Sequence, residues 1–156
     1  MNKILLILIL ALFLQSVKGQ DTSTTENRTL TFDWTDLKII QRADAILTDS
    51  TRWNKKDDRE CQDDISTGYY SLYCALYKAS IEIAGEYVHR RAALQIVRFT
   101  LEKYDNGRVK DHRLMDWNNH PSTTFAELKK VLRESLQIVQ KQLGNSEKTP
   151  HDNNHQ

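Results

Sequence analysis

The amino-acid sequence predicts an all-α protein: a compact bundle of about four helices with one disulfide, after an N-terminal signal peptide. Apolar residues recur at helical spacing in four stretches, residues that typically begin and end helices flank them, and strand patterns are nearly absent. We expect a signal peptide (1–19), a flexible lead-in (20–31), a helical domain (32–144) and a disordered tail (145–156).

The first nineteen residues have the pattern of an export signal. Lys3 precedes an unbroken apolar run at 4–14, and residues 17–19 resemble a signal peptidase motif. The run is shorter than the roughly 20 residues that span a bilayer, so we expect cleavage, no membrane span afterwards, and a periplasmic or secreted protein. A retained anchor is the alternative. Cleavage removes Lys3 and Lys18 and takes the formal charge from +1 to −1, which argues against nucleic-acid binding.

The chain contains only two cysteines, Cys61 and Cys74. An oxidising compartment favours their pairing, and their spacing matches no C-x-x-C redox motif. We therefore predict a structural disulfide, with two free thiols as the alternative. Two cysteines alone do not make a zinc site, and we expect neither a metal nor a cofactor.

The first two predicted helices have clear boundaries. The first opens at Asp33, a good N-cap, with Asp36 three residues later. The second covers about 69–84, ends at Gly85 and has a wide apolar surface, which is typical of a central helix. A tyrosine stripe on it predicts core packing, with a stacking platform for a sugar or base as the alternative; its members are Tyr69, Tyr73 and Tyr77.

The third predicted helix covers about 86–105, and the fourth begins with a capping box at Thr124 and Glu127 and closes at Gly144. Two segments do not fit the four helices. Residues 52–64 are rich in charges of both signs, which predicts a solvated loop. Residues 111–121 are polar, and Pro121 with its neighbouring asparagines argues against a continuous helix there.

His89, Arg90 and Arg91 lie near the start of the third predicted helix. If that helix begins at Glu86, Arg91 falls on the solvated face with Arg98, whereas His89 and Arg90 fall inside the apolar arc. A cation there needs a hydrogen-bonded acceptor. Asp116 is the preferred candidate, Glu86 the next, and Asn118 is a secondary partner. A structural Arg90–carboxylate pair is one interpretation; the other is a polar pocket formed by His89, Arg90, Asp116, Asn118 and His120.

The sequence lacks the common catalytic and phosphate-binding motifs, including H-E-x-x-H, phosphate-binding glycine loops and G-x-S-x-G. His112, Asp116 and His120 recur at a spacing of four and would share a helix face as metal ligands, but the polar, proline-terminated segment disfavours this. His89 is a candidate general base, but no sequence pattern identifies a nucleophile.

Three runs resemble a family of small uncharacterised bacterial proteins: 73–80 with its Cys-Ala-Leu, 89–95 with its His-Arg-Arg start, and 114–121 with Trp-Asn-Asn-His-Pro. The last run also resembles a broader helical group with W-N-D-x-P-x-T, from which Asn119 departs. The resemblance covers roughly 40–140 and implies no known activity.

Three functions follow as hypotheses. The leading one is an exported, non-enzymatic helical module that binds a partner, for which another protein is one candidate, or has a structural role in the cell envelope. The second is a small hydrolase or ligand-binding protein whose site joins His89, Arg90, Asp116 and His120. The third is an inhibitor or immunity-type protein that uses the charged segment 52–64.

Overall fold

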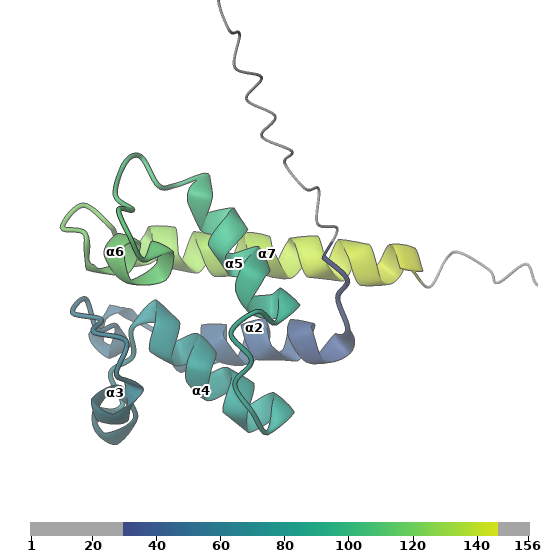
Figure 1. Ribbon diagram of the computed structural model, residues 1–156, viewed down its shortest axis with the longest axis horizontal. Coiled ribbons are helices and arrows are strands. Elements are labelled where there is room, and N and C mark those ends of the chain that lie inside the picture. The colour runs from purple at the N-terminus through teal and green to yellow at the C-terminus, as the bar shows by residue number, and fades with distance from the viewer. Residues whose placement is uncertain (1–29, 147–156) are drawn as a thin grey trace, which may run out of the picture.

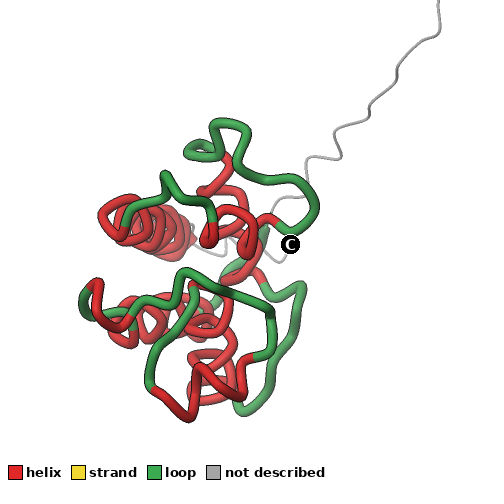
Figure 2. The backbone as a smooth tube through the Cα atoms, turned by 90° about the vertical axis from the view of Figure 1, so that its left-hand side faces the viewer, coloured by secondary structure: helices red, strands yellow, loops and turns green. Residues whose placement is uncertain are grey.

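The computed structural model describes residues 30–146, and this part of the chain is all-helical (Figures 1 and 2). The predicted signal peptide, most of the lead-in and most of the tail lie outside the described residues. Six α-helices and one short 3₁₀ helix are present in 30–146, more than the four predicted. They are α2 (Trp34–Ile46), η1 (Ser50–Arg52), α3 (Cys61–Thr67), α4 (Leu72–Ala84), α5 (Ala92–Glu102), α6 (Arg113–Asn119) and α7 (Phe125–Ser146). Between residues 30 and 146, no helix has the length and apolar character that crossing a bilayer requires.

Helix α2 is the centre of the packing. The Asp33 side chain accepts the Asp36 N–H at 2.8 Å and the Asp36 side chain accepts the Asp33 N–H at 3.0 Å, which confirms the predicted start. The helix packs against α4, α5 and α7, and Figure 1 shows it beside α7 along the long axis of the molecule. Ile39, Ile40 and Ala43 are fully buried on its core side.

Helix α4 begins at Leu72, three residues later than predicted, because Ser71 caps it: the Ser71 hydroxyl accepts the Cys74 N–H at 3.1 Å. It ends as predicted at Gly85, whose φ of 77° lies in the left-handed region that favours glycine. Tyr73 and Tyr77 are half-buried and pack against Tyr87, which supports the core-packing interpretation, whereas Tyr69 is exposed.

Helix α5 begins at Ala92, so the predicted start at Glu86 is wrong. The reason lies in α2. The Asp36 carboxylate accepts the Ala93 N–H at 3.1 Å and pairs with Arg91, with 3.0 Å between Arg91 Nε and Asp36 Oδ1. A carboxylate from another helix thus supplies the negative charge that the N-terminus of α5 favours. Residues 85–91 cross from α4 to α5 outside both helices.

The two segments that did not fit the four predicted helices both contain short helices. The predicted solvated loop at 52–64 runs into α3, and it is only partly solvated because Asp57 and Asp64 are buried. Helix α6 occupies 113–119, although the sequence argued against a helix there. It stops at Asn119 because Pro121 forces an extended backbone on His120, whose ψ is 133°. Trp117 on α6 is fully buried.

Helix α7 begins with the predicted capping box: the Thr124 N–H donates to Glu127 at 2.8 Å, and the Glu127 N–H donates to the Thr124 hydroxyl at 3.2 Å. The helix continues through Gly144 to Ser146, so it extends into the predicted tail. Buried Arg108 holds its first turn, donating to Glu127 at 2.8 Å and to the Thr123 hydroxyl at 2.9 Å.

The predicted disulfide between Cys61 and Cys74 is present and joins α3 to α4. Its closed loop is short, with a sequence separation of 13. We expect the double variant Cys61→Ser/Cys74→Ser to be less stable by about 3 kcal/mol, because the unfolded chain regains the entropy of the open loop. Urea unfolding at 25 °C measures this difference. An unchanged unfolding midpoint would contradict the structural role.

The ionisation of Glu127 makes the free energy of unfolding depend on pH. Hydrogen bonding from Arg108 is the main cause that lowers the pKa of Glu127 to about 2, against a usual value near 4.3 in unfolded chains. Because the folded pKa is depressed, the contribution to stability is complete above about pH 4.3 and is lost as the pH falls towards 2. Glu127→Gln should therefore be less stable than the wild type at pH 7, with the gap closing between pH 4 and pH 2. Urea unfolding across this range, with the exposed Glu86→Gln as control, tests it.

Candidate functional site

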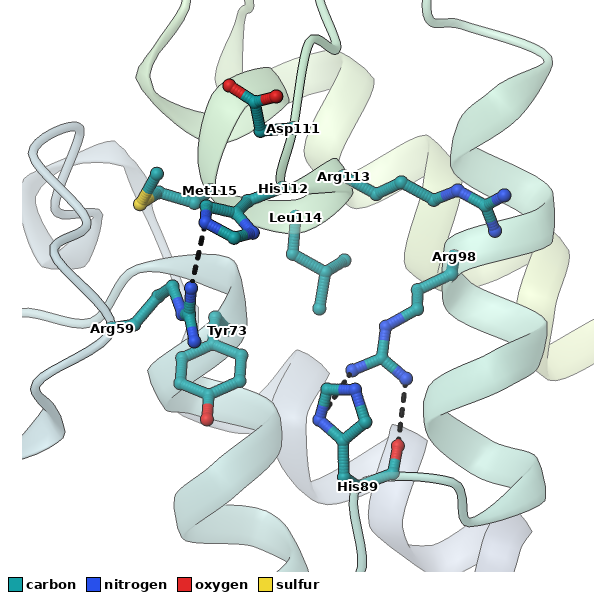
Figure 3. A pocket seen from close by; sticks show the side chains of 9 residues that line it. All are labelled: Arg59, Tyr73, His89, Arg98, Asp111, His112, Arg113, Leu114 and Met115. Atoms are coloured by element: carbon teal, nitrogen blue, oxygen red, sulfur yellow. Dashed lines mark hydrogen bonds between the residues drawn. The ribbon is translucent and has the colours of Figure 1, made fainter.

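A cavity with a volume of about 490 Å³ opens between α4, α5 and α6 (Figure 3). Three parts of the chain line it: the loop before α3 with the start of α4, the segment before α5 with α5 itself, and α6 with the residues just before it. The lining residues are Arg59, Tyr73, His89, Arg98, Asp111, His112, Arg113, Leu114 and Met115. Cations and imidazoles therefore dominate the wall.

Arg98 and His89 form the first of two Arg–His pairs. The Arg98 guanidinium is buried, with 8% of the residue exposed, and donates to the His89 carbonyl oxygen at 2.9 Å and to His89 Nδ1 at 3.4 Å. Arginine can only donate, so Nδ1 accepts and the ring proton lies on Nε2. Among residues 30–146, no carboxylate oxygen lies within 4 Å of a nitrogen of Arg98.

Arg59 and His112 form the second pair, with 2.9 Å between Arg59 Nη1 and His112 Nε2. Figure 3 shows the two pairs on either side of Leu114. The Arg59 backbone has a φ of 68°, an uncommon conformation for a non-glycine residue, and the buried Asp57 stabilises it by accepting the Arg59 N–H at 2.8 Å. Within the described chain, Arg59 also lacks a carboxylate within 4 Å.

The charge around the cavity is unbalanced. Arg113 has a partner, Glu102, with 2.8 Å between Nη1 and Oε1. Desolvation first, and then the charges of Arg98, Arg59 and Arg90, lower the pKa of His89, so its imidazole is neutral at pH 7. Asp111 is the one acidic residue of the lining, against three guanidinium groups. The cavity is therefore cationic, with Tyr73, Leu114 and Met115 as its less polar surface.

The structure does not bring the five predicted pocket residues together. His89 lines the cavity, but Arg90 is exposed and is absent from the lining. The predicted geometry of the basic run is wrong because α5 begins at Ala92: Arg91, expected on the solvated face, is half-buried, donates to Asp33 and forms an ion pair with Asp36.

Asp116 is not the acceptor for Arg90 that the sequence favoured. Its Oδ2 accepts three backbone N–H groups, from Lys110 at 2.9 Å, Asp111 at 2.7 Å and His112 at 2.9 Å. Desolvation opposes ionisation, but these three hydrogen bonds outweigh it and lower the pKa of Asp116. Asp116 therefore shapes the approach to α6 and positions His112 at the cavity.

Asn118 and His120 lie away from the cavity lining. Asn118 is fully buried, and its side-chain oxygen accepts from Trp53 Nε1 at 2.7 Å and from the Leu72 N–H at 3.1 Å. Its side-chain nitrogen donates to the Asn54 carbonyl oxygen at 2.8 Å and to the Asn119 side-chain oxygen at 3.0 Å. His120 bonds locally to Ser122 at 2.8 Å. Asn118 is thus a structural link between α6, the start of α4 and the 53–54 loop.

Sequence reasoning missed Arg59, Arg98, His112 and Arg113 as members of one site. Arg98 falls on the polar face of α5 when that helix is considered alone, yet it is buried and donates to the His89 carbonyl oxygen in the segment between α4 and α5. The available signal was the excess of basic and histidine residues in segments 89–98 and 111–113, which are separate in the sequence. In residues 30–146 no group of three or more His, Cys, Asp or Glu side chains is arranged to hold a metal ion.

A family model described as a family of unknown function (DUF6197) matches residues 31–136. The match includes every residue that lines the cavity. It agrees with the resemblance to an uncharacterised family seen in the sequence. No curated protein and no solved structure matches the chain.

Asn118→Ala tests whether this residue is structural. The substitution leaves the Trp53 Nε1–H and the Leu72 N–H without their acceptor, and each buried unpaired group costs about 1–3 kcal/mol. We expect a loss of about 3 kcal/mol in the free energy of unfolding, measured with urea. The exposed Gln140→Ala on α7 is the control and should change stability by less than about 0.5 kcal/mol. Wild-type stability in Asn118→Ala would return Asn118 to the list of ligand-binding candidates.

Proposed function

The chain belongs to DUF6197, a family of unknown function, and we propose that it is an exported helical protein that binds a small oxyanion in the cavity between α4, α5 and α6. The observation that carries the proposal is the buried guanidinium of Arg98, which donates to neutral acceptors of His89 and has no carboxylate within 4 Å among residues 30–146. A carboxylate or phosphate group supplies the missing negative charge.

Burial of an unpaired charge is costly, whereas a guanidinium paired with an oxyanion forms short, charge-assisted hydrogen bonds. Arg98 and Arg59 line the same cavity from opposite sides (Figure 3), so both guanidinium groups face a ligand that occupies it. His89 adds an Nε2–H donor, because its Nδ1 accepts from Arg98. Five N–H donors in a planar fork suit arginine to this recognition better than lysine.

The lining favours binding over catalysis. Its side chains supply arginines, imidazoles, a tyrosine, a carboxylate and two apolar groups, and none is a serine, threonine or cysteine. In the hydrolase hypothesis His89 is the base, yet its Nδ1 accepts a hydrogen bond from Arg98 and its Nε2 carries the proton. The residues therefore support the non-enzymatic hypothesis.

The inhibitor or immunity hypothesis relied on the charged segment 52–64. Asp57 and Asp64 of this segment are buried and accept hydrogen bonds from the fold itself: Asp57 from the Arg59 N–H, and Asp64 from the Ser71 N–H at 2.8 Å and the Asn54 amide at 2.7 Å. The segment thus has fewer free acidic groups for a protein partner than its sequence suggests. Export is supported by the disulfide, since an oxidising compartment preserves it.

Titration calorimetry with inorganic phosphate tests the proposal. We expect binding that weakens as salt rises, and at least a tenfold loss of affinity in Arg98→Met, because one charge-assisted hydrogen bond contributes about 1.5–3 kcal/mol. Arg59→Gln should give a similar loss and removes an exposed side chain, so it remains informative if Arg98→Met folds poorly. The exposed Arg133→Gln on α7 is the matched control.

Absence of phosphate binding by the wild type, or wild-type affinity in both Arg59→Gln and Arg98→Met, contradicts the proposal. Arg90→Gln distinguishes the cavity from the pocket that the sequence predicted. A loss of affinity in Arg90→Gln together with wild-type affinity in Arg98→Met would restore the sequence-based pocket.

A further inference from the structure

His89 is a titratable group in direct contact with the buried cation of the cavity. Its Nδ1 lies 3.4 Å from Arg98 Nη2 and 3.2 Å from the Tyr87 hydroxyl, and its carbonyl oxygen accepts from Arg98 Nη1 at 2.9 Å. Figure 3 shows the imidazole directly beside the Arg98 guanidinium. The His89 residue is exposed, so a proton from solvent can reach its ring.

The free protein keeps the imidazole of His89 neutral. Arg98 can only donate, so its contact with Nδ1 exists only while Nδ1 carries no proton. Protonation would put an N–H on Nδ1 and add a second positive charge beside Arg98. Desolvation first, and then the charges of Arg98, Arg59 and Arg90, lower the pKa of His89. The cations around the cavity thus hold a proton off this ring.

Titratable side chains share the cavity with His89 from each element that lines it. They are Tyr73 on α4, Arg98 on α5, Arg59 in the loop before α3, and Asp111, His112 and Arg113 around the start of α6. Arg113 is already paired with Glu102, and Figure 3 shows the Asp111 carboxylate pointing away from His89. An anion that enters the cavity therefore supplies the negative charge that offsets the guanidinium groups near the imidazole.

Tyr87 provides the partner that a protonated His89 needs. Burial raises the pKa of the Tyr87 hydroxyl, so it keeps its proton, and a tyrosine hydroxyl can both donate and accept. It can donate to Nδ1 of the neutral ring and, after turning about its C–O bond, accept from Nδ1–H of the imidazolium. The Tyr87 ring packs on Tyr73 and Tyr77, with centroids 6.0 and 4.9 Å away. The acceptor for an added proton is therefore already in place.

We propose that the oxyanion site takes up a proton together with its ligand: the anion attracts the N–H groups of Arg98, and one proton from solvent bonds to Nδ1 of His89, where the Tyr87 hydroxyl accepts it. The anion then faces an imidazolium as well as the guanidinium groups. This inference rests on the proposed oxyanion site and deepens it by naming its regulation by pH. Affinity rises as the pH falls, because the bound state holds one more proton than the free state.

Calorimetric titration with sodium sulfate from pH 5 to pH 8, at constant ionic strength, tests the coupling. Sulfate is a tetrahedral oxyanion that does not titrate in this range, whereas phosphate does. Solvent screens an exposed imidazole, so we expect the anion to raise the pKa of His89 by about one unit, which corresponds to about five- to tenfold tighter binding at pH 5 than at pH 8. Titrations in two buffers of different ionisation enthalpy should show net proton uptake near pH 6.

Variants assign the proton through the ratio of the affinities at pH 5 and pH 8. His89→Gln should give a ratio close to one, whereas His120→Gln, outside the cavity lining, should keep the wild-type ratio. Tyr87→Phe keeps the ring and removes the acceptor of Nδ1–H, so the ratio should fall to about half or less, because hydrogen bonds to charged groups are the stronger ones. Tyr69→Phe, at a residue that is 53% exposed, is its matched control.

NMR provides a second measurement that does not depend on affinity in a variant. The imidazole resonances of His89, assigned by their loss in His89→Gln, should titrate with a pKa about one unit higher in saturating sulfate than without it. An equal pKa in both conditions contradicts the coupling.

The outcomes separate the two proposals. A wild-type ratio close to one, or an unchanged ratio in His89→Gln, overturns the coupling and leaves the oxyanion site standing. A ratio that persists in His89→Gln and is lost in His112→Gln assigns the proton to the other imidazole and also overturns it. If sulfate does not bind at any pH, the coupling fails, and the titration with inorganic phosphate decides whether the oxyanion site fails with it.

Discussion

The side-chain amide of Asn118 is the constraint on which the arrangement around the cavity depends. It makes four hydrogen bonds from a fully buried position, to groups on the 53–54 loop, on the first residue of α4 and on the end of α6. These three elements provide or adjoin three walls of the cavity. A buried amide with all its groups satisfied has one favourable orientation, so the spacing between the walls is set from the interior.

Acidic residues that do not line the cationic cavity hold its basic residues in position. Asp116 collects three N–H groups and turns the chain so that His112 reaches Arg59. Buried Asp57 holds the Arg59 backbone in its left-handed conformation. These acidic side chains are occupied by the backbone and leave the guanidiniums uncompensated. The fold thus separates its positive from its negative groups, which is the arrangement expected of a site prepared for an anion.

Sequence patterns predicted the helix ends that are set by residues close to one another in the chain. The N-cap at Asp33, the capping box at Thr124 and the end of α4 at Gly85 involve residues close in sequence, and each was predicted correctly. The start of α5 was not, because Asp36 from a different helix determines it. Short α3 and α6 also escaped prediction, since their helical turns are stabilised by the disulfide and by packing of Trp117. The cationic site required three distant segments to meet, which periodicity within one segment cannot reveal.

The Asp36 carboxylate couples the N-termini of α2 and α5. Its carboxylate accepts the N–H of Asp33, three residues before it at the start of α2, and the N–H of Ala93, 57 residues after it at the start of α5. Fraying of either helix start therefore exposes the same buried acid. We therefore expect the two N-termini to open together, and we expect the segment between α4 and α5, which carries His89, to open with them, because Arg91 at its end pairs with the same acid.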